Sequence, residues 1–542
     1  MIDTLDSNIG ITMSKVRDQK TGEIFKRFSI SIEGSADKVV YIANNESVAK
    51  IYRELRTYSD KISPESSVAR TQVDVVIERA PAKMLNGVTF QGWHDDVYIT
   101  EEWQKGEDQE SFCFIHDTSH SRRRKKGSLK QYRRNVVQPS KRSSYLTFAL
   151  MTGLSGPLLK HAKLSEGAVF HLFGPSTTGK TSCAHIGESI SRGPDHLLGW
   201  SQTERRMEEL AAERYDQLLT MNAAEKARRV HQALVLHVLT HQIAEGEAKG
   251  RSRSVHDALP NLTSRSPVLS TGNFSGAEMA RACGVDWNKQ EEARFISIPV
   301  PRGVDGGIID RSTRPMTDEQ NRAKIERIVA AAREDYGVAL PIWVMRVHRR
   351  WDKVPGYIDE FVSRSGVTDP FKVRIARKFG LVYAAGVIAV KSKFMPWTLD
   401  FVFDVVNRLM NRALANVVDE VTPKKVVRAL RRATVGKDKL PWLPSDRRLG
   451  LGDRSLVGFK YRKRDRPLIA LRREALPKLT GLPESSETII DMLGKAGVLE
   501  KGHGGKATQQ IPFTLVTPRG REQKSLRMVV VDAKKLSNSS AA

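Results

Sequence analysis

The sequence predicts an α/β P-loop NTPase core with a β-rich N-terminal domain, a helical lid region and a C-terminal winged helix. Three observations predict this fold class. A complete phosphate-binding loop (P-loop) begins at Gly174, between an apolar strand and a helix. The length of 542 residues exceeds what one hydrophobic core organises. Near the C-terminus, long helices give way to helix, turn, helix and two short β segments.

The composition indicates a folded and strongly basic protein. Apolar residues make up 40% and charged residues 28%, which argues against wholesale disorder. Lys and Arg number 88 against 62 Asp and Glu, so the formal net charge is +26. We expect nucleic acid as the polyanionic partner, because neutralised phosphates release their counterions. An anionic membrane surface is the weaker alternative, since no basic amphipathic helix stands out.

Zinc proteins, secreted proteins and membrane-spanning proteins do not fit the sequence. Cys113, Cys183 and Cys283 lie far apart and show no metal-ligand spacing. The first residues lack the profile of a signal peptide, and no apolar run approaches the ~20 residues of a membrane span. We therefore expect a cytoplasmic protein without a membrane partner.

Residues 1–143 are predicted to form the β-rich N-terminal domain. Segments of β composition lie at 28–32, 39–42 and 73–77, separated by Gly, Pro and Asn. The main helix is expected at 46–58. A basic stretch follows at 122–127, where a solvated loop and a phosphate contact are both open interpretations.

The P-loop core is predicted at 144–311 and the helical lid domain at 312–436. The core alternates helices with short apolar strands, which favours a parallel sheet. The lid carries long helical stretches at 320–336 and 371–389. A helix beginning near residue 422 has a basic face, for which solvent and DNA are both open partners.

The C-terminal part is predicted to comprise a basic linker, a winged-helix domain and a tail, at 437–466, 467–532 and 533–542. The second helix of the winged helix is expected at 485–496, and its wing strands at 511–516 and 526–531. Winged helices also bind proteins, but a cluster of basic residues favours DNA here: Lys501, Lys506, Arg519, Arg521 and Lys524.

The P-loop carries the clearest chemistry of the chain. Gly174 and Gly179 free the backbone to curl, so that its N–H groups face phosphate oxygens. Lys180 then pairs with the β and γ phosphates, while the Thr181 hydroxyl binds Mg²⁺. We therefore predict ATP and Mg²⁺ as cofactors. The predicted binding residues are Gly174, Pro175, Ser176, Thr177, Thr178, Gly179, Lys180, Thr181 and Ser182.

The acidic strand end that ATP hydrolysis requires is absent from its expected place. The next apolar strand, at 218–221, ends in Asn222 and Ala223 instead of an Asp-Glu pair. Asn222 accepts a hydrogen bond from a metal-bound water but brings no charge, so it is a weak predicted metal contact. ATP binding is thus better supported than turnover. The nearest acids that would have to compensate are Asp216, Glu225 and Glu245.

Several motifs recur together in one known family. Before the P-loop they are GWHD at 92–95 and GSLKQY at 127–132. After it they are WSQT at 200–203, GEAKGR at 246–251, LSTG at 269–272, RFISIP at 294–299, and RKF at 377–379 with AAG at 384–386. Over roughly residues 90–400 the chain resembles a family filed as a domain of unknown function. That family forms the helicase-like C-terminal part of primase-helicase proteins of phages and mobile elements.

The resemblance implies an additional-strand P-loop ATPase related to hexameric replicative helicases, and hence a homo-oligomeric ring on DNA. Such rings complete each site with an arginine of the neighbouring subunit. Arg294 is our first choice for this role, ahead of Arg302 and Arg311. Asn273 stands where the family carries Glu, so the hydrolytic acids of the family cannot be transferred to this chain. The predicted catalytic residues are Lys180, Asn273 and Arg294.

Two functions are open on the sequence. The first is an ATP-dependent DNA helicase or translocase of a phage or mobile genetic element, acting in replication. The second is a non-hydrolysing P-loop initiator or loader protein that binds DNA. Asn222 and Ala223 discriminate between them. A small-molecule kinase is less fitting, because the positive charge and the winged helix have no use there. No primase-like segment precedes the core, so any primer synthesis would need a separate primase.

Overall fold

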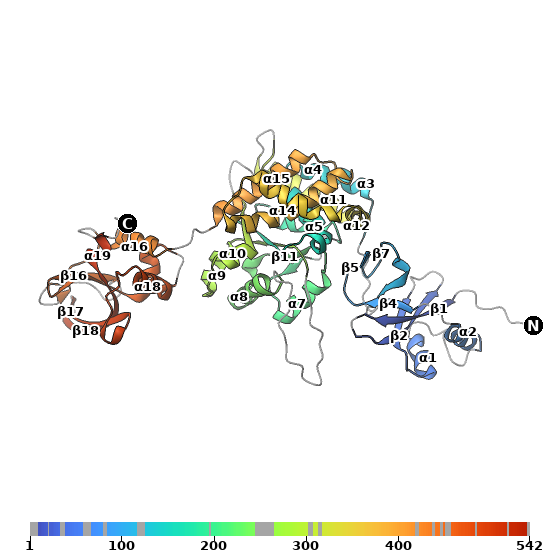
Figure 1. Ribbon diagram of the computed structural model, residues 1–542, viewed down its shortest axis with the longest axis horizontal. Coiled ribbons are helices and arrows are strands. Elements are labelled where there is room, and N and C mark those ends of the chain that lie inside the picture. The colour runs from blue at the N-terminus through green and yellow to red at the C-terminus, as the bar shows by residue number, and fades with distance from the viewer. Residues whose placement is uncertain are drawn as a thin grey trace, which may run out of the picture. The chain divides into compact units, whose positions relative to one another are not determined.

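The computed structural model forms two compact units, Met1–Val417 and Val418–Ala542 (Figure 1). The structure describes residues 9–19, 21–32, 38–57, 67–79, 84–115, 125–193, 197–243, 265–301, 307–312, 317–417, 422–435, 439–444, 448–449, 457–482, 485–517 and 520–538. Within these ranges, no helix combines the length and the apolar character that crossing a bilayer requires.

The N-terminal region is β-rich, as predicted. Five strands form a mixed sheet in the order β3-β2-β1-β4-β8. They are β1 (Ile9–Asp18), β2 (Ile24–Ile32), β3 (Lys38–Ala43), β4 (Met84–Val88) and β8 (Phe112–Phe114). A smaller sheet contains β5 (Gly92–His94), β6 (Val97–Ile99) and β7 (Gln104–Lys105). The predicted strands at 28–32 and 39–42 lie within β2 and β3.

One predicted strand of this region is a helix. Segment 73–77 lies inside α2 (Ser67–Glu78), while the helix expected at 46–58 is α1 (Val48–Arg56). Val73 is fully buried in the core of the larger sheet, and Val76 and Ile77 pack against the same core. Spacings of three and four residues place these side chains on one face of a helix. The helical period therefore prevails over the β propensity of valine and isoleucine.

The central sheet is parallel throughout. Its order is β10-β11-β12-β9-β13, so β12 lies between β9 and β11. The strands are β9 (Val169–Phe173), β10 (Leu198–Gly199), β11 (Leu219–Asn222), β12 (Val268–Gly272) and β13 (Phe295–Pro299). Successive side chains of β9 enter different cores: Phe170 packs with helices such as α5 (Ser144–Ser155), and Val169 packs with α7 (Glu204–Glu213) and α8 (Arg229–His237).

The helices that follow the sheet share its core. They are α11 (Asp318–Glu334), α12 (Leu340–His348), α13 (Val354–Ser365), α14 (Pro370–Lys391) and α15 (Leu399–Asn416). Phe379 of α14 contacts both Phe148 of α5 and Phe170 of β9, with ring centroids 5.6 and 5.1 Å away. The helical stretches predicted at 320–336 and 371–389 are confirmed as α11 and α14. The residues before and after the predicted domain border at 311/312 therefore belong to one hydrophobic core.

The second unit begins earlier than the predicted winged helix. Its sheet has the order β14-β17-β18-β16-β15, and α16 packs on its other helices. The elements are α16 (Pro423–Thr434), β14 (Arg448–Leu449), β15 (Gly458–Lys463), β16 (Arg466–Leu471), α17 (Leu476–Thr480), α18 (Ser486–Lys495), β17 (Thr508–Thr517), β18 (Gly520–Asp532) and α19 (Ala533–Asn538). The segment expected to be a linker thus supplies strands, because Phe459 and Leu468 of the β15–β16 hairpin are buried.

Candidate nucleotide-binding site

The P-loop connects β9 to α6 (Lys180–Glu188) at the carboxyl edge of the parallel sheet. The φ angles of Gly174 and Gly179 are 145° and 94°, a region that favours glycine. A Cβ atom at Gly174 would collide with the carbonyl oxygen of Val300. A Cβ atom at Gly179 would lie 2.7 Å from the side chain of Ile308 and 3.3 Å from that of Ile325. Close packing around the loop therefore requires both glycines.

Lys180 holds its ammonium group inside the loop. Its Nζ donates hydrogen bonds to the carbonyl oxygens of Gly174 and Pro175, at 2.8 and 2.7 Å. The residue is 7% exposed. Burial lowers the pKa of Lys180, while the nearby carboxylate of Glu225 opposes that shift. The cation is therefore positioned where an incoming phosphate oxygen can replace the loop carbonyls.

Three polar side chains link the loop to the two neighbouring strand ends. The Thr181 hydroxyl donates to Asn222 Oδ1 at 3.0 Å, and the Thr271 hydroxyl donates to the same oxygen at 2.7 Å. Asn222 ends β11 and Thr271 lies in β12. The fold thus brings together Thr181 and Asn222, the two predicted metal contacts. Thr271 was not among the predicted site residues, although its strand was recognised.

Asn273 faces the P-loop from the end of β12. Its Nδ2 donates to the Ser176 hydroxyl oxygen at 3.3 Å. Both residues line the cleft described below, as do the remaining hydroxyl residues of the loop, namely Thr177, Thr178, Thr181 and Ser182. The predicted catalytic position of Asn273 is therefore beside the loop, where an amide replaces the carboxylate that the resemblance leads one to expect.

Of the acids that would compensate for Asn222, only Glu225 lies at the cleft among the described residues. Ala223 has φ 58° and ψ 60°, and its N–H donates to the Thr271 hydroxyl at 3.2 Å. This turn leads into a short 3-10 helix that carries Glu225. Asp216 precedes β11 at its opposite end and is fully buried, with two 2.6 Å hydrogen bonds from Arg265. Glu245 lies outside the described residues.

A cleft of about 580 Å³ opens over the loop, within the range of small-molecule sites. One wall consists of the P-loop and the strand ends. The other wall is the start of α11, whose sequence carries no nucleotide-binding motif: Asp318, Asn321, Arg322, Ile325 and Glu326. The helix itself was predictable, but its contact with the loop depends on the packing of Ile325 near Gly179.

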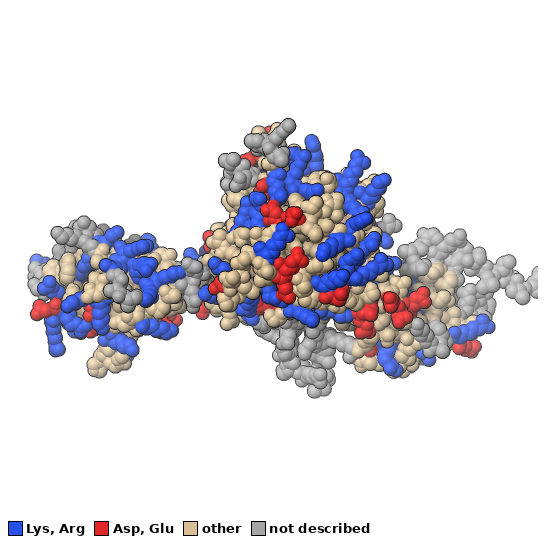
Figure 2. Space-filling model, turned by 45° about the horizontal axis from the view of Figure 1, so that its top comes forward, with Lys and Arg blue, Asp and Glu red and all other residues tan. Residues whose placement is uncertain are grey.

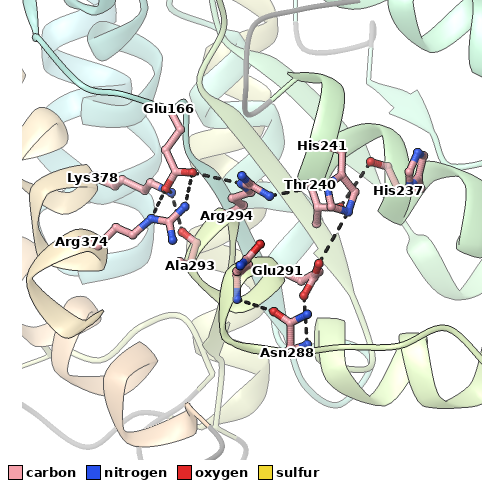
Figure 3. Close-up of polar contacts among 11 residues, drawn as sticks. Glu166, His237, Thr240, His241, Asn288, Glu291, Ala293, Arg294, Arg374 and Lys378 are labelled. Carbon is pink, nitrogen blue, oxygen red and sulfur yellow. Dashed lines mark hydrogen bonds and ion pairs between the residues drawn. The ribbon is translucent and has the colours of Figure 1, made fainter. Parts of the chain in front are cut away.

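Arg294 lies away from this cleft. It directly precedes β13, whose Phe295 pairs with Val169 at the start of β9, whereas the P-loop follows the end of β9. The Arg294 side chain is 13% exposed, and its Nε donates to Glu166 Oε2 at 3.0 Å (Figure 3). This geometry does not fit the predicted role of an arginine that reaches a neighbouring subunit.

Glu166 is the centre of this buried ion cluster. Arg374 donates to both of its carboxylate oxygens at 2.6 Å, and Lys378 Nζ lies 2.7 Å from Oε1 (Figure 3). Burial raises the pKa of Glu166, but the hydrogen bonds from Arg374 and Lys378 outweigh this effect and bring it to about 2. The cluster therefore joins the amino ends of the sheet strands to α14.

Of the two other predicted arginines, only Arg311 is described, and it does not line the cleft. Arg302 lies outside the described residues. Arg311 pairs with Asp404 of α15, and its guanidinium carbon lies 5.0 Å from the ring centre of Phe401. Arg311 is thus held within the chain by neighbours on α15.

The basic segments predicted to contact DNA are only partly described. In the segment 122–127, Lys126 pairs with Glu334 at 2.7 Å. In the second unit, Lys501, Lys506 and Arg521 are exposed. Arg519 and the side chain of Lys524 lie outside the described structure, as does segment 246–251, one of the motifs of the family resemblance.

Comparison with known proteins gives a family match over part of the chain and a structural likeness over nearly all of it. Residues 49–258 match the model of a domain of unknown function, DUF927. A solved structure described as the active helicase Cch of SCCmec type IV is similar to 99% of this chain and 96% of its own. The TM-score is 0.59 at 14% sequence identity, so this likeness shows the fold alone. No curated protein matches the chain.

Proposed function

We propose that this protein is an ATP-dependent DNA helicase or translocase of a phage or mobile genetic element, acting in DNA replication. The observation that carries this proposal is the P-loop cleft with the Lys180 ammonium at its centre. The strand order supports it, because β12 separates the P-loop strand from β11, as in additional-strand ATPases. The fold likeness to an active helicase and the DUF927 match support it further.

ATP would bind with its phosphates against the P-loop. Lys180 would exchange the carbonyl oxygens of Gly174 and Pro175 for phosphate oxygens, and Thr181 would face the metal. A bound Mg²⁺ neutralises charge on the β and γ phosphates. The oxygen atoms next to the Thr181 hydroxyl are weak ligands for a cation. Asn222 is a neutral amide, and its Oδ1 already accepts hydrogen bonds from two hydroxyl groups.

Glu225 is the acid that we propose for orienting the attacking water. It follows Asn222 by three residues, lines the same cleft and lies close enough to Lys180 to influence its pKa. Its carboxylate is exposed in the described structure, so it is free of the burial that fixes Asp216. Arg322, from the same chain, lines the cleft as well and would supply the additional cation that we first sought in Arg294.

The second unit supports a winged-helix role in DNA binding. The helix α16 and the strands β14 and β15 are followed by the strand β16, the helices α17 and α18 and the hairpin β17–β18. β16 pairs with β18, so the strand before the two helices and the hairpin after them lie in one sheet, as in a winged helix. With Lys501, Lys506 and Arg521 exposed, we propose that this unit contacts duplex DNA. A homo-oligomeric ring and a separate primase complete the proposal.

The alternative is a non-hydrolysing initiator or loader protein. The neutral Asn222 and the absence of an acid at position 223 favour it. ATP turnover of the purified protein, measured with and without single-stranded DNA, decides between the two. A helicase shows turnover that DNA stimulates, whereas a loader binds ATP without turnover.

Two variants locate the acid. We expect Glu225→Gln to lower turnover by about 100-fold or more with little change in ATP affinity, since a positioned catalytic group is lost. We expect Asn222→Asp to raise Mg²⁺ affinity and turnover, because the added carboxylate accepts the same hydroxyl protons and brings charge. Glu326→Gln, at another acid of the same cleft, is the matched control. Full turnover in Glu225→Gln would exclude Glu225 as the acid.

A further inference from the structure

A basic surface lies next to the nucleotide cleft and shares α11 with it. Figure 2 shows Lys and Arg side chains gathered over the part of the first unit that carries α3 (Leu129–Tyr132), α4 (Gln138–Ser140), α11 and α12. We call this area the basic surface and define it by Arg133, Arg134, Arg142, Lys324, Arg346 and Lys393.

Two pairs within the basic surface lie close enough to repel each other, namely Arg133 with Arg346 and Lys324 with Arg142. Arg133 Nη2 donates to the backbone oxygen of Lys393 at 3.4 Å. Burial lowers the pKa of Arg133, and the charge of Arg346 lowers it further. Burial and the charge of Arg142 likewise lower the pKa of Lys324. A bound polyanion reduces mutual repulsion of this kind.

Helix α11 touches both the cleft and the basic surface. Asp318, Asn321 and Arg322, in its first turns, line the cleft, and Ile325 lies against the P-loop. Lys324 belongs to the basic surface, and α11 also packs on the π-helical segment that carries Arg133 and Arg134. A shift of α11 on nucleotide binding would therefore move part of the basic surface.

We propose that the basic surface binds the phosphate backbone of DNA and that α11 couples this binding to the nucleotide in the cleft. The proposal deepens the proposed function, on which it rests for the identity of the nucleotide. We assign the contact to phosphates rather than bases, because the residues that carry it are Lys and Arg, whose charge attracts phosphate oxygens of any sequence. Its affinity for DNA is then independent of sequence and falls steeply with salt.

The first test removes charge from the surface. Arg134 and Arg142 are exposed, so Arg134→Glu with Arg142→Glu reverses two charges with little change in packing. We expect the affinity for single-stranded DNA to fall by at least about 10-fold, and the log-log salt slope to drop by about one for each lost phosphate contact. ATP affinity should be unchanged. A milder pair, Arg134→Gln with Arg142→Gln, should show the same direction with a smaller effect.

The matched control is Arg53→Glu with Arg56→Glu, which reverses two exposed charges on α1. This control should bind DNA like the wild type. Wild-type DNA affinity in both surface variants would overturn the proposal. Equal losses in the control would also overturn it, since the effect would then follow total charge. Binding of the basic surface to phosphatidylserine vesicles with no change in DNA affinity would identify a membrane instead.

The second test concerns the coupling. A non-hydrolysable ATP analogue should change the DNA affinity of the wild type by several-fold, and DNA should change the affinity for the analogue by the same factor. Arg322→Ala, on the cleft side of α11, should retain DNA binding without nucleotide but bring this factor close to one. An unchanged factor would overturn the coupling role of α11. Because the analogue is not hydrolysed, this outcome is independent of whether the protein turns over ATP.

Discussion

Lys180 holds the position that decides whether the cleft binds a nucleotide. Its ammonium group is the cation nearest the loop centre, and its hydrogen bonds go to backbone carbonyls rather than to a carboxylate. Those acceptors are neutral, so a phosphate competes with them favourably on electrostatic grounds. A lysine salt-bridged to an acid would resist such an exchange.

Loss of the Lys180 ammonium should abolish ATP binding. We expect Lys180→Ala to reduce ATP affinity by more than about 100-fold, because charge-assisted contacts to the β and γ phosphates are lost. Equilibrium binding of a fluorescent ATP analogue measures the effect. Lys163→Ala, at a lysine outside the cleft lining, is the control and should bind as the wild type. Unchanged affinity in Lys180→Ala would exclude this loop as the nucleotide site.

Single residues also show where sequence reasoning succeeds and where it ends. The P-loop residues and Asn222 were predictable, because their order along the chain places them at adjoining strand ends of one sheet. The partner of Arg294 was not, because Glu166 lies 128 residues away and precedes a different strand. Likewise, nothing in the local pattern of α11 indicates that Arg322 faces the loop. Contacts between segments that are far apart in the sequence can be identified only from the folded structure.

At the scale of elements, one buried ion cluster joins the sheet to α14. Glu166 is 9% exposed and faces Arg294, Arg374 and Lys378. Burial lowers the pKa of Lys378 to about 8, even though the charge of Glu166 opposes that shift. The carboxylate of Glu166 is therefore the counter-charge of the buried Lys378 and of the largely buried Arg294 at neutral pH.

Removal of this charge should destabilise the first unit. We expect Glu166→Gln to cost about 3–5 kcal/mol in the free energy of unfolding, since the buried Lys378 ammonium loses its counter-ion. Asp359→Asn is the matched control, because Asp359 pairs with Arg377 of α14 at 2.7 Å on the surface and should cost under about 1 kcal/mol. Urea denaturation measures both. Similar values for the two variants would contradict a structural role for the cluster.

The strand that leads into the P-loop makes stability depend on pH. His171 of β9 is fully buried, with contacts of 2.9 Å to the Ser270 hydroxyl and to the carbonyl oxygen of Phe274. Burial lowers its pKa to about 4. The imidazole is thus neutral in the folded chain at pH values where it is protonated in the unfolded chain, whose histidine pKa is about 6.5.

We therefore expect the free energy of unfolding to fall as the pH drops from about 6.5 to 4, because only the unfolded state takes up this proton. Between pH 7.5 and 5 the loss through His171 is about 2 kcal/mol. Urea denaturation at both pH values measures it, and His171→Gln should lose correspondingly less. An equal loss in wild type and variant would assign the pH dependence to other groups, such as His161, whose pKa burial also lowers to about 4.

At the scale of the whole molecule, the boundary between the two units lies before residue 418, not at 467. Val426 and Leu430 of α16 are buried with Ile469 of β16 and Ile489 of α18. A deletion that begins at 467 would therefore leave α16 without its core. The sequence pattern does not reveal this boundary, because α16 follows the helices α11 to α15 as another amphipathic helix.

Deletion of residues 418–542 should separate the two binding activities. We expect duplex DNA binding to weaken more than single-strand binding, because the second unit carries the proposed winged helix. ATP affinity should stay the same, since every residue of the cleft belongs to the first unit. Filter binding with matched duplex and single-stranded oligonucleotides measures the difference. Equal losses on both substrates would contradict a duplex-specific role.

The single core that runs from the central sheet to α15 has a mechanical consequence. A hinge between two domains needs a boundary that few side chains cross. Here the rings of Phe148, Phe170 and Phe379 pack together and join α5 and the sheet to α14, which belongs to the predicted lid. Sheet and helices then behave as one stiff body. In the proposed ring, the nucleotide would then act on a neighbouring subunit through small shifts at the edge of this body, such as the start of α11, rather than through a swinging lid.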